Sequence, residues 1–240
     1  MQVVLLAAGL GSRLGTLTQS LPKALIEVAG VTLLERAVGF ARRLSPSEIV
    51  VVGGFGFGDV EAEIQRRELP VTLVENTAFR DGNLISLLAA RPRVREGFVL
   101  MNVDHIYRPA IAERVAPVAS EVTGYIDTDR TLGADDMKVS RDSAGRIRAI
   151  AKTLTTFDCG YVGMTQVPAA ALARYWAAAA AALAEEGRAI HVERILARLA
   201  ASESPPACVD ISGVGWLEVD MQDERTHAET VVRAAPADWV

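Results

Sequence analysis

A glycine-rich segment near the start of the chain constrains the fold more than any other feature. The sequence LAAGLGSRL at residues 6–14 continues a short apolar run at residues 3–6 that is typical of a buried strand. Where such a strand ends, the backbone N–H groups around Gly9 and Gly11 can approach phosphate oxygens closely. Ser12 adds a hydroxyl donor, and Arg13 adds a forked cation suited to a triphosphate. The segment therefore predicts a phosphate-binding loop.

Two familiar glycine loops do not fit this spacing. A P-loop carries its lysine directly after its last glycine, but the first lysine here is Lys23, far beyond Gly11. A dinucleotide-binding loop would place a third glycine at position 14, which is Leu14. The spacing therefore argues against an ATPase of the P-loop type and against an NAD(P)-dependent oxidoreductase.

Lysine is used sparingly in this chain. Lysine and arginine together number 25, and only three of them are lysines: Lys23, Lys138 and Lys152. Pro22 stiffens the backbone just before Lys23, so this compact charge can return to the phosphates held by the glycine loop. The scarcity favours a specific need for an ammonium rather than a guanidinium at these positions, with chance as the alternative.

Short apolar strands alternate with amphipathic helices through the first half of the chain. Strands are predicted at 3–6, 48–52, 71–74 and 98–101, and helices at 33–44, 59–67 and 83–90. Beyond about residue 120 the pattern changes to strands at 122–127, 137–140, 147–150, 161–164 and 214–219, with helices at 169–184, 191–199 and 223–233. We expect an α/β fold: a Rossmann-like, mostly parallel sheet with helices on both faces and an antiparallel elaboration in the second half. The whole of 1–240 is expected to form one domain.

Composition excludes several classes of partner. A net charge of −5 and a pI near 5.3 argue against nucleic acid. The most apolar helical stretch, 169–184, is too short for a membrane span and contains Arg174, so no membrane insertion is expected. The start MQVVLLAAG lacks the features of a secretory signal, and the two cysteines form no framework. A cytoplasmic location is therefore expected.

Two carboxylates follow predicted strands. Asp104 comes after the strand at 98–101, and Asp220 closes the run WLEVD; Asp210 and Glu218 compete with Asp220 on chemistry alone. Ligands of open α/β sheets bind at the carboxyl ends of strands. Magnesium is commonly held there by one or two carboxylates together with substrate phosphates.

The run LAAGLGSRLGTLTQSLPKALIEVAGVTLLER at 6–36 resembles the opening signature of nucleotidyltransferases that activate sugar phosphates and related alcohols. The resemblance implies that the glycine loop binds the NTP and that Arg13 and Lys23 are the catalytic cations. It favours Asp220 as the partner of Asp104 in holding Mg²⁺, because GWLEVDMQD at 215–223 resembles the family's C-terminal strand. It also implies that the segment at 75–86 receives the base, although turn chemistry alone would explain its polar residues. The nucleotide-binding residues implied are Leu6, Ala8, Gly9, Gly11, Ser12, Asn76, Gly82 and Asn83.

Shorter stretches are similar to the inositol-1-phosphate cytidylyltransferases: LMNVDHIYRP at 100–109, DDMKV at 135–139, GRIRAIAK at 145–152 and FDCGYV at 157–162. The resemblance divides the domain into an NTP-binding half, about 1–120, and an acceptor-binding half, about 121–240. It implies CTP and inositol 1-phosphate as substrates, with CDP-inositol and pyrophosphate as products. The acceptor-binding residues implied are Lys138, Lys152, Asp158 and Gly160.

Other side chains are interpreted more plainly. His105 is expected either to contact substrate or metal-bound water, or to pack behind the site. His191 and His227 lie on predicted helices and are expected at the surface, and Cys159 is expected to be a packed residue rather than a nucleophile, since no base is placed beside it.

The expected reaction is a direct in-line displacement on the α-phosphorus of the NTP, with no activating base. Phosphocholine and sugar 1-phosphates remain alternative acceptors, although an aromatic content of 5% counts against a cage for choline. A catalytically silent nucleotide-binding protein on the same fold is the alternative of a different class. The sequence leaves open the base, the acceptor, the downstream pathway, the role of His105 and the oligomeric state, a homo-oligomer included.

Overall fold

The computed structural model describes residues 1–18, 21–115 and 119–239. A nine-stranded sheet runs through the molecule in the order β10-β9-β11-β6-β1-β4-β5, with β8 pairing β11 and β12 pairing β8. Its strands are β1 (Gln2–Ala7), β4 (Ile49–Gly53), β5 (Thr72–Glu75), β6 (Phe98–Asn102), β8 (Thr123–Asp127), β9 (Lys138–Arg141), β10 (Ile147–Ala151), β11 (Cys159–Val167) and β12 (Ala207–Asp210).

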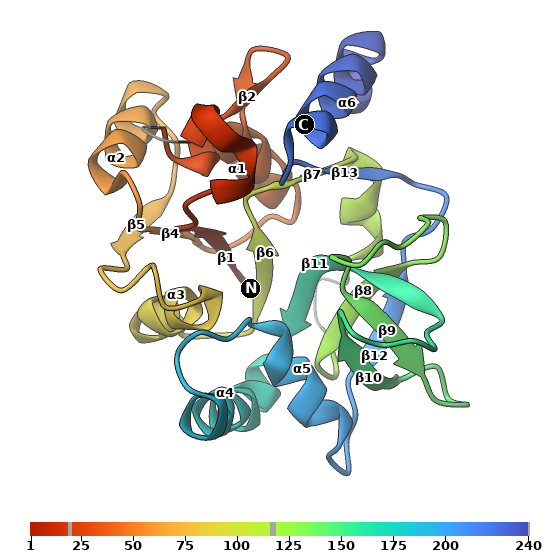
Figure 1. Ribbon diagram of the computed structural model, residues 1–240. Helices are drawn as coiled ribbons and strands as arrows, with labels where there is room; N and C mark the ends of the chain where they lie inside the picture. Colours follow the sequence, from red (N-terminus) through yellow and green to blue (C-terminus); the bar gives the residue numbers. More distant parts are fainter. Residues whose placement is uncertain (19–20, 116–118, 240) are drawn as a thin grey trace.

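Strands β6, β1, β4 and β5 are parallel, as the alternating strand–helix pattern predicts. Successive residues of β1 face opposite sides of the sheet. Val3 and Leu5 pack into the hydrophobic cluster on one side, and Val4 and Leu6 pack into the cluster on the other. Helices cover both faces, with α1 (Leu33–Arg43), α2 (Phe57–Arg66) and α6 (Gln222–Ala234) on the first. On the second face lie α3 (Asn83–Ala90), α4 (Leu172–Glu186) and α5 (Glu193–Ala200) (Figure 1).

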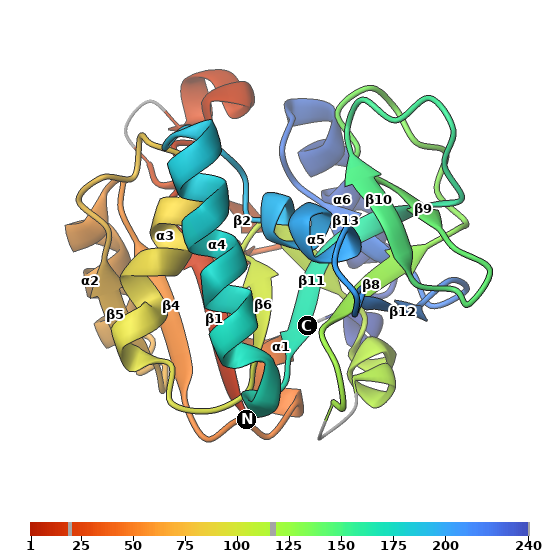
Figure 2. The same ribbon diagram turned by 90° about the horizontal axis from the view of Figure 1, so that it is seen from below.

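The second half of the chain forms the antiparallel elaboration. Strand β11 is buried along its whole length and pairs antiparallel with β6, β8 and β9. It therefore joins the parallel strands to the group β8, β9, β10 and β12, which gathers beside them in Figure 2. The predicted fold class and the mostly parallel first half are confirmed.

Local sequence explains where the elements begin and end. Thr32 and Glu35 form a reciprocal capping box at the start of α1, with the Thr32 hydroxyl accepting from the Glu35 amide at 3.1 Å. Helix α4 begins at Leu172 rather than at residue 169, because residues Ala169–Ala171 form a 3₁₀ turn after Pro168. Among the described helices, none is long and apolar enough to cross a membrane.

One predicted element lies in a different place. The run at 214–219 was expected to return to the main sheet, but β13 (Trp216–Glu218) instead pairs antiparallel with β7 (His105–Tyr107) in a separate two-stranded sheet. Residues 214, 215 and 219 are outside the strand. A second small pair, β2 (Glu27–Val28) with β3 (Val31–Thr32), precedes α1.

Candidate active site

A cavity of about 440 Å³ opens at the carboxyl ends of β1 and β6, where the two halves of the chain meet. Its lining comes from the glycine loop, the start of α3, the β6–β7 turn, strand β11, the segment before α5 and the end of β13. The carboxyl edge of parallel strands is where open α/β sheets bind ligands. The cavity is therefore the natural candidate for the active site.

The β7–β13 pair brings the two predicted metal ligands together. Glu218 stands opposite His105 in this pair, and the amide of Val219 donates to the carbonyl oxygen of Asp104 at 2.9 Å. Asp220 follows one residue later, and the Glu224 carboxylate accepts from its backbone amide at 2.8 Å. Two carboxylates 116 residues apart in sequence thus share one wall of the cavity.

Lys23 lies between these carboxylates. Its Nζ donates to Asp104 Oδ2 and to Asp220 Oδ1, both at 2.6 Å, and its side chain is only 7% exposed. Arg13 donates from Nη1 to the second oxygen of Asp220 at 2.6 Å. All four residues line the cavity, so two cations and two anions form one network beside the glycine loop.

Electrostatics keep this network charged. Burial alone would lower the pKa of Lys23, but Asp104 and Asp220 raise it above its ordinary value. Burial would likewise raise the pKa of both aspartates, and Lys23 holds the two pKa values below their usual range, with His105 adding to the effect on Asp104. The Asp220 charge raises the pKa of Arg13.

The donor set fits a magnesium ion that is completed by a substrate. Asp104 and Asp220 retain side-chain exposures of 22% and 24% toward the cavity. Among residues 1–18, 21–115 and 119–239, no group of three or more histidine, cysteine or acidic side chains could hold an ion alone. Two carboxylates plus phosphate oxygens are the usual ligands of Mg²⁺ in such sites.

His105 lines the cavity and is fixed against Asp104. Its Nδ1 lies 2.7 Å from Asp104 Oδ1, and its ring stacks on Trp216 with centroids 5.2 Å apart. A Cβ placed on Gly163 would come within 2.7 Å of the His105 ring, so glycine is required at this point of β11. Of the two roles expected for His105, the contacts favour orientation of Asp104.

The predicted nucleotide-binding residues fall into two groups. Those that line the cavity are Leu6, Ala8, Gly9, Gly11, Ser12, Gly82 and Asn83. Asn76 does not: it is buried, its amide nitrogen donates to Ser86 at 2.9 Å, and its oxygen accepts from the amide of Ala78 at 3.0 Å. The Asn76 side chain therefore shapes the turn before α3, as its turn chemistry allows, and lies outside the cavity lining.

The predicted acceptor residues divide in the same way. Lys152 and Gly160 line the cavity, but Lys138 and Asp158 do not. Lys138 is buried, and its Nζ donates to the carbonyl oxygens of Gly133 at 2.6 Å and of Lys152 at 2.8 Å. It therefore positions the backbone that carries Lys152.

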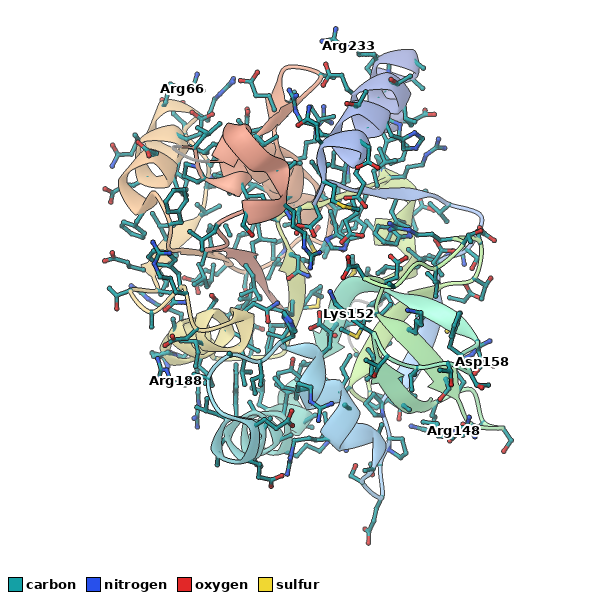
Figure 3. The ribbon with its side chains drawn as sticks, in the orientation of Figure 1. Arg66, Arg148, Lys152, Asp158, Arg188 and Arg233 are labelled. Carbon is teal, nitrogen blue, oxygen red and sulfur yellow. The ribbon has the colours of Figure 1, made fainter. Side chains whose placement is uncertain are left out.

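Asp158 is exposed and accepts from the Arg141 amide at 2.6 Å. Figure 3 shows it at the outer edge of the β9–β10 hairpin, whereas Lys152 lies near the centre of the molecule. Lys138 and Asp158 therefore lie outside the cavity lining, and their binding of the acceptor stays a prediction. Cys159 is a packed residue, as expected, and burial raises the pKa of its thiol to about 11.

Several cavity residues were missed by sequence reasoning. Asp127 ends β8, Arg130 follows it, and Glu193 begins α5. His191 was expected on a helix at the surface; it is exposed, but it precedes α5 and also lines the cavity. Asp127 closes an apolar strand just as Asp104 does, and that signal could have identified it. Nothing local distinguishes Glu193 from an ordinary acid at a helix start.

This fold and this site define the chain as a nucleotidyltransferase. The model of the MobA-like NTP transferase domain family matches residues 3–203, and the chain belongs to that family.

Two solved structures share the fold. The inositol-1-phosphate CTP transferase from T. maritima superposes with a TM-score of 0.81 at 18% identity, covering 98% of this chain and 96% of that chain. The CTP:phosphocholine cytidylyltransferase from Streptococcus pneumoniae gives a TM-score of 0.77 at 18% identity, covering 96% and 98%.

A curated relative from Rubrobacter xylanophilus, a bifunctional IPC transferase and DIPP synthase, is 34% identical over 231 residues. The match covers 95% of this chain and 51% of the relative. The chain thus spans about half the length of the curated relatives that it matches in this way.

Proposed function

We propose that the chain is a CTP:inositol-1-phosphate cytidylyltransferase, which forms CDP-inositol and pyrophosphate in the cytoplasm. The proposal rests on one observation: Lys23 lies between Asp104 and Asp220 in the cavity that the glycine loop also lines. The T. maritima neighbour, an inositol-1-phosphate CTP transferase, and the Rubrobacter relative, an IPC transferase and DIPP synthase, support this choice of nucleotide and acceptor.

The chemistry is an in-line displacement. An oxygen of the acceptor's phosphate forms a bond to the α-phosphorus of CTP, while the bond from that phosphorus to the bridging oxygen breaks and its electron pair leaves with pyrophosphate. A phosphate dianion is already nucleophilic, so a general base is unnecessary. Catalysis then depends on positioning and on neutralising charge.

The chain's own residues supply most of that neutralisation. Amides of the loop around Gly9 and Gly11 bind the phosphates, and Arg13 and Lys23 oppose the charge that develops on the triphosphate. Asp104 and Asp220 would hold Mg²⁺, which when bound neutralises phosphate oxygens. When the nucleotide binds, Lys23 would exchange carboxylate contacts for phosphate contacts.

The cavity's aromatic side chains favour a hydroxylated acceptor over choline. Trp216 is stacked on His105 and lies under the guanidinium of Arg130, 4.8 Å from its ring centroid. The guanidinium carbon of Arg80 lies over the Phe79 ring, 5.2 Å from its centroid. A quaternary ammonium needs free aromatic faces, and Trp216 and Phe79, which line the cavity together with Tyr161, already meet a cation or a stacked ring.

Pyrophosphate release tests the proposal. Four NTPs are each combined with inositol 1-phosphate, phosphocholine and glucose 1-phosphate, with Mg²⁺ or with EDTA. We expect release with CTP, inositol 1-phosphate and Mg²⁺ together, and none in EDTA. Release with another pair would retain the reaction class but refute the acceptor. Binding of CTP without release in any mixture would favour a silent nucleotide-binding protein.

A further inference from the structure

The same cavity contains an acid that the reaction above does not use. Glu193 is the first residue of α5, is 8% exposed and lines the cavity. Within the described part of the chain, no hydrogen bond or ion pair joins its side chain to another residue's side chain. A buried carboxylate without such a partner is costly, and proteins rarely retain one without a use.

The neighbours of Glu193 are basic. Burial raises its pKa, whereas a hydrogen bond from its own backbone amide and the positive charges of His191 and Lys152 act in the opposite direction. His191 and Lys152 also line the cavity. These positive groups would repel a second cation, such as the ammonium of phosphocholine, whereas they would not repel a neutral hydroxyl.

Hydroxyl groups match the hydrogen-bonding capacities of Glu193 and Lys152. An ionised carboxylate only accepts hydrogen bonds, and a lysine ammonium only donates them. A hydroxyl does both, so neighbouring hydroxyls on one ring can donate to Glu193 and accept from Lys152. We propose that Glu193 is a specificity-determining residue that accepts hydrogen bonds from the ring hydroxyls of the acceptor.

The backbone holds Glu193 in a fixed relation to the nucleotide half. The amide of Val192 donates to Asn83 Oδ1 at 2.8 Å, and the Leu84 amide approaches the Ile190 carbonyl oxygen at 3.4 Å. Both contacts connect the start of α3 to the segment before α5. Glu193 is thereby positioned relative to the expected base-binding segment, as a residue that sets acceptor orientation must be.

The proposal rests on the proposed function, because the ring hydroxyls are those of inositol 1-phosphate. The test compares wild type with Glu193→Gln and Glu193→Ala on inositol 1-phosphate and on cyclohexyl phosphate, which has the same ring without hydroxyls. Glu185→Gln is the control, since Glu185 is an exposed acid near the end of α4 that pairs with Arg198.

We expect both Glu193 variants to lower kcat/KM for inositol 1-phosphate roughly tenfold or more, the scale of a hydrogen bond to a charged group. The effect should fall mainly on the KM of this acceptor. The KM for CTP, any activity with cyclohexyl phosphate and the kinetics of Glu185→Gln should stay unchanged. Equal losses with both acceptors, a raised KM for CTP, or no change at all would overturn the role of Glu193.

Binding separates this inference from the proposed function. Titration calorimetry with inositol 1-phosphate requires no turnover, and wild type should bind more tightly than Glu193→Ala. If wild type binds inositol 1-phosphate but releases no pyrophosphate, the function fails and Glu193 is still tested. If wild type uses CTP and inositol 1-phosphate while the variants match it, only the Glu193 proposal fails. Failure of wild type to bind at millimolar concentration overturns both.

Discussion

At the scale of single residues, the site depends on a lysine that compensates two carboxylates. Lys23 is buried against Asp104 and Asp220, each 2.6 Å from its Nζ. An ammonium fits between two carboxylates as a compact charge, whereas a guanidinium needs a flat and wider space. This geometry explains why one of the chain's three lysines stands at this position.

Replacing Lys23 should affect the reaction more than nucleotide binding. Lys23→Ala is expected to lower kcat about 10²- to 10³-fold, the loss typical when one group that stabilises the transition state is removed. Lys23→Arg should not restore turnover. The measurement is steady-state pyrophosphate release, with circular dichroism to show that the fold is retained. A Lys23→Ala enzyme with near-normal kcat would refute the catalytic role.

The sequence predicted which residues form this cluster better than it predicted the rest of the cavity lining. Lys23 and Asp104 could be identified because each follows a recognisable local pattern, a Pro-Lys step and the end of an apolar strand. Asp220 needed the family resemblance. For Lys138, the sequence cannot show that its ammonium donates to three backbone carbonyl oxygens and lies outside the cavity lining. Glu193 was missed because its burial depends on packing between distant segments.

At the scale of elements, the contact between α3 and the segment before α5 connects the two halves of the site. Gly82 precedes α3 with φ of 94°, and a Cβ there would lie 2.6 Å from the carbonyl oxygen of Ile190. Glycine is therefore required both by conformation and by close approach. Periodicity predicted both helices, but a backbone contact across 108 positions leaves no trace in local sequence.

Substitutions at two glycines separate the requirement of backbone conformation from that of close approach. Gly187 also has a positive φ, 80°, but a Cβ there would meet nothing within 4 Å. Gly187→Ala should lose only the conformational preference, about 1–3 kcal/mol of unfolding free energy, because its φ of 80° and ψ of −165° lie in a region that is essentially confined to glycine. Gly82→Ala should lose clearly more and should also raise the KM for the acceptor. Urea unfolding and steady-state kinetics measure both effects, and equal stability losses would argue against the close contact.

At the scale of the whole molecule, the cavity requires both ends of the chain. The family model matches residues 3–203, yet Asp220 and the strand β13 that positions it lie beyond that match. The alternating pattern predicted the parallel half because each strand is a continuous apolar run. The two-stranded β7–β13 pair was not predicted, since three-residue strands carry too little periodicity to assign a partner.

Glu193, whose carboxylate pairs with no other side chain among the described residues, should also be visible in global stability. Burial raises the pKa of Glu193 above its value in the unfolded chain, so ionisation in the folded protein reduces stability. Glu193→Gln removes that cost without changing shape. The groups whose charges or polarity act with Glu193 are Lys152, His191, His105, Tyr161 and Tyr175, and all are retained in the variant.

The sign of the effect depends on pH. Below the unfolded-state pKa, about 4.3, the carboxyl is protonated in both states, and the two proteins should melt at similar temperatures. As pH rises from there through the folded-state pKa, wild type loses stability that the glutamine variant keeps. At pH 7 and without ligands, Glu193→Gln should therefore have the higher Tm, and a gain of about 1 kcal/mol corresponds to about 2–4 °C for a chain of this size. Calorimetric scans from pH 4 to pH 8 measure the difference. A lower Tm for the variant at pH 7 would mean that Glu193 has a stabilising partner in the folded protein, and its assignment to substrate recognition would then lose its physical basis.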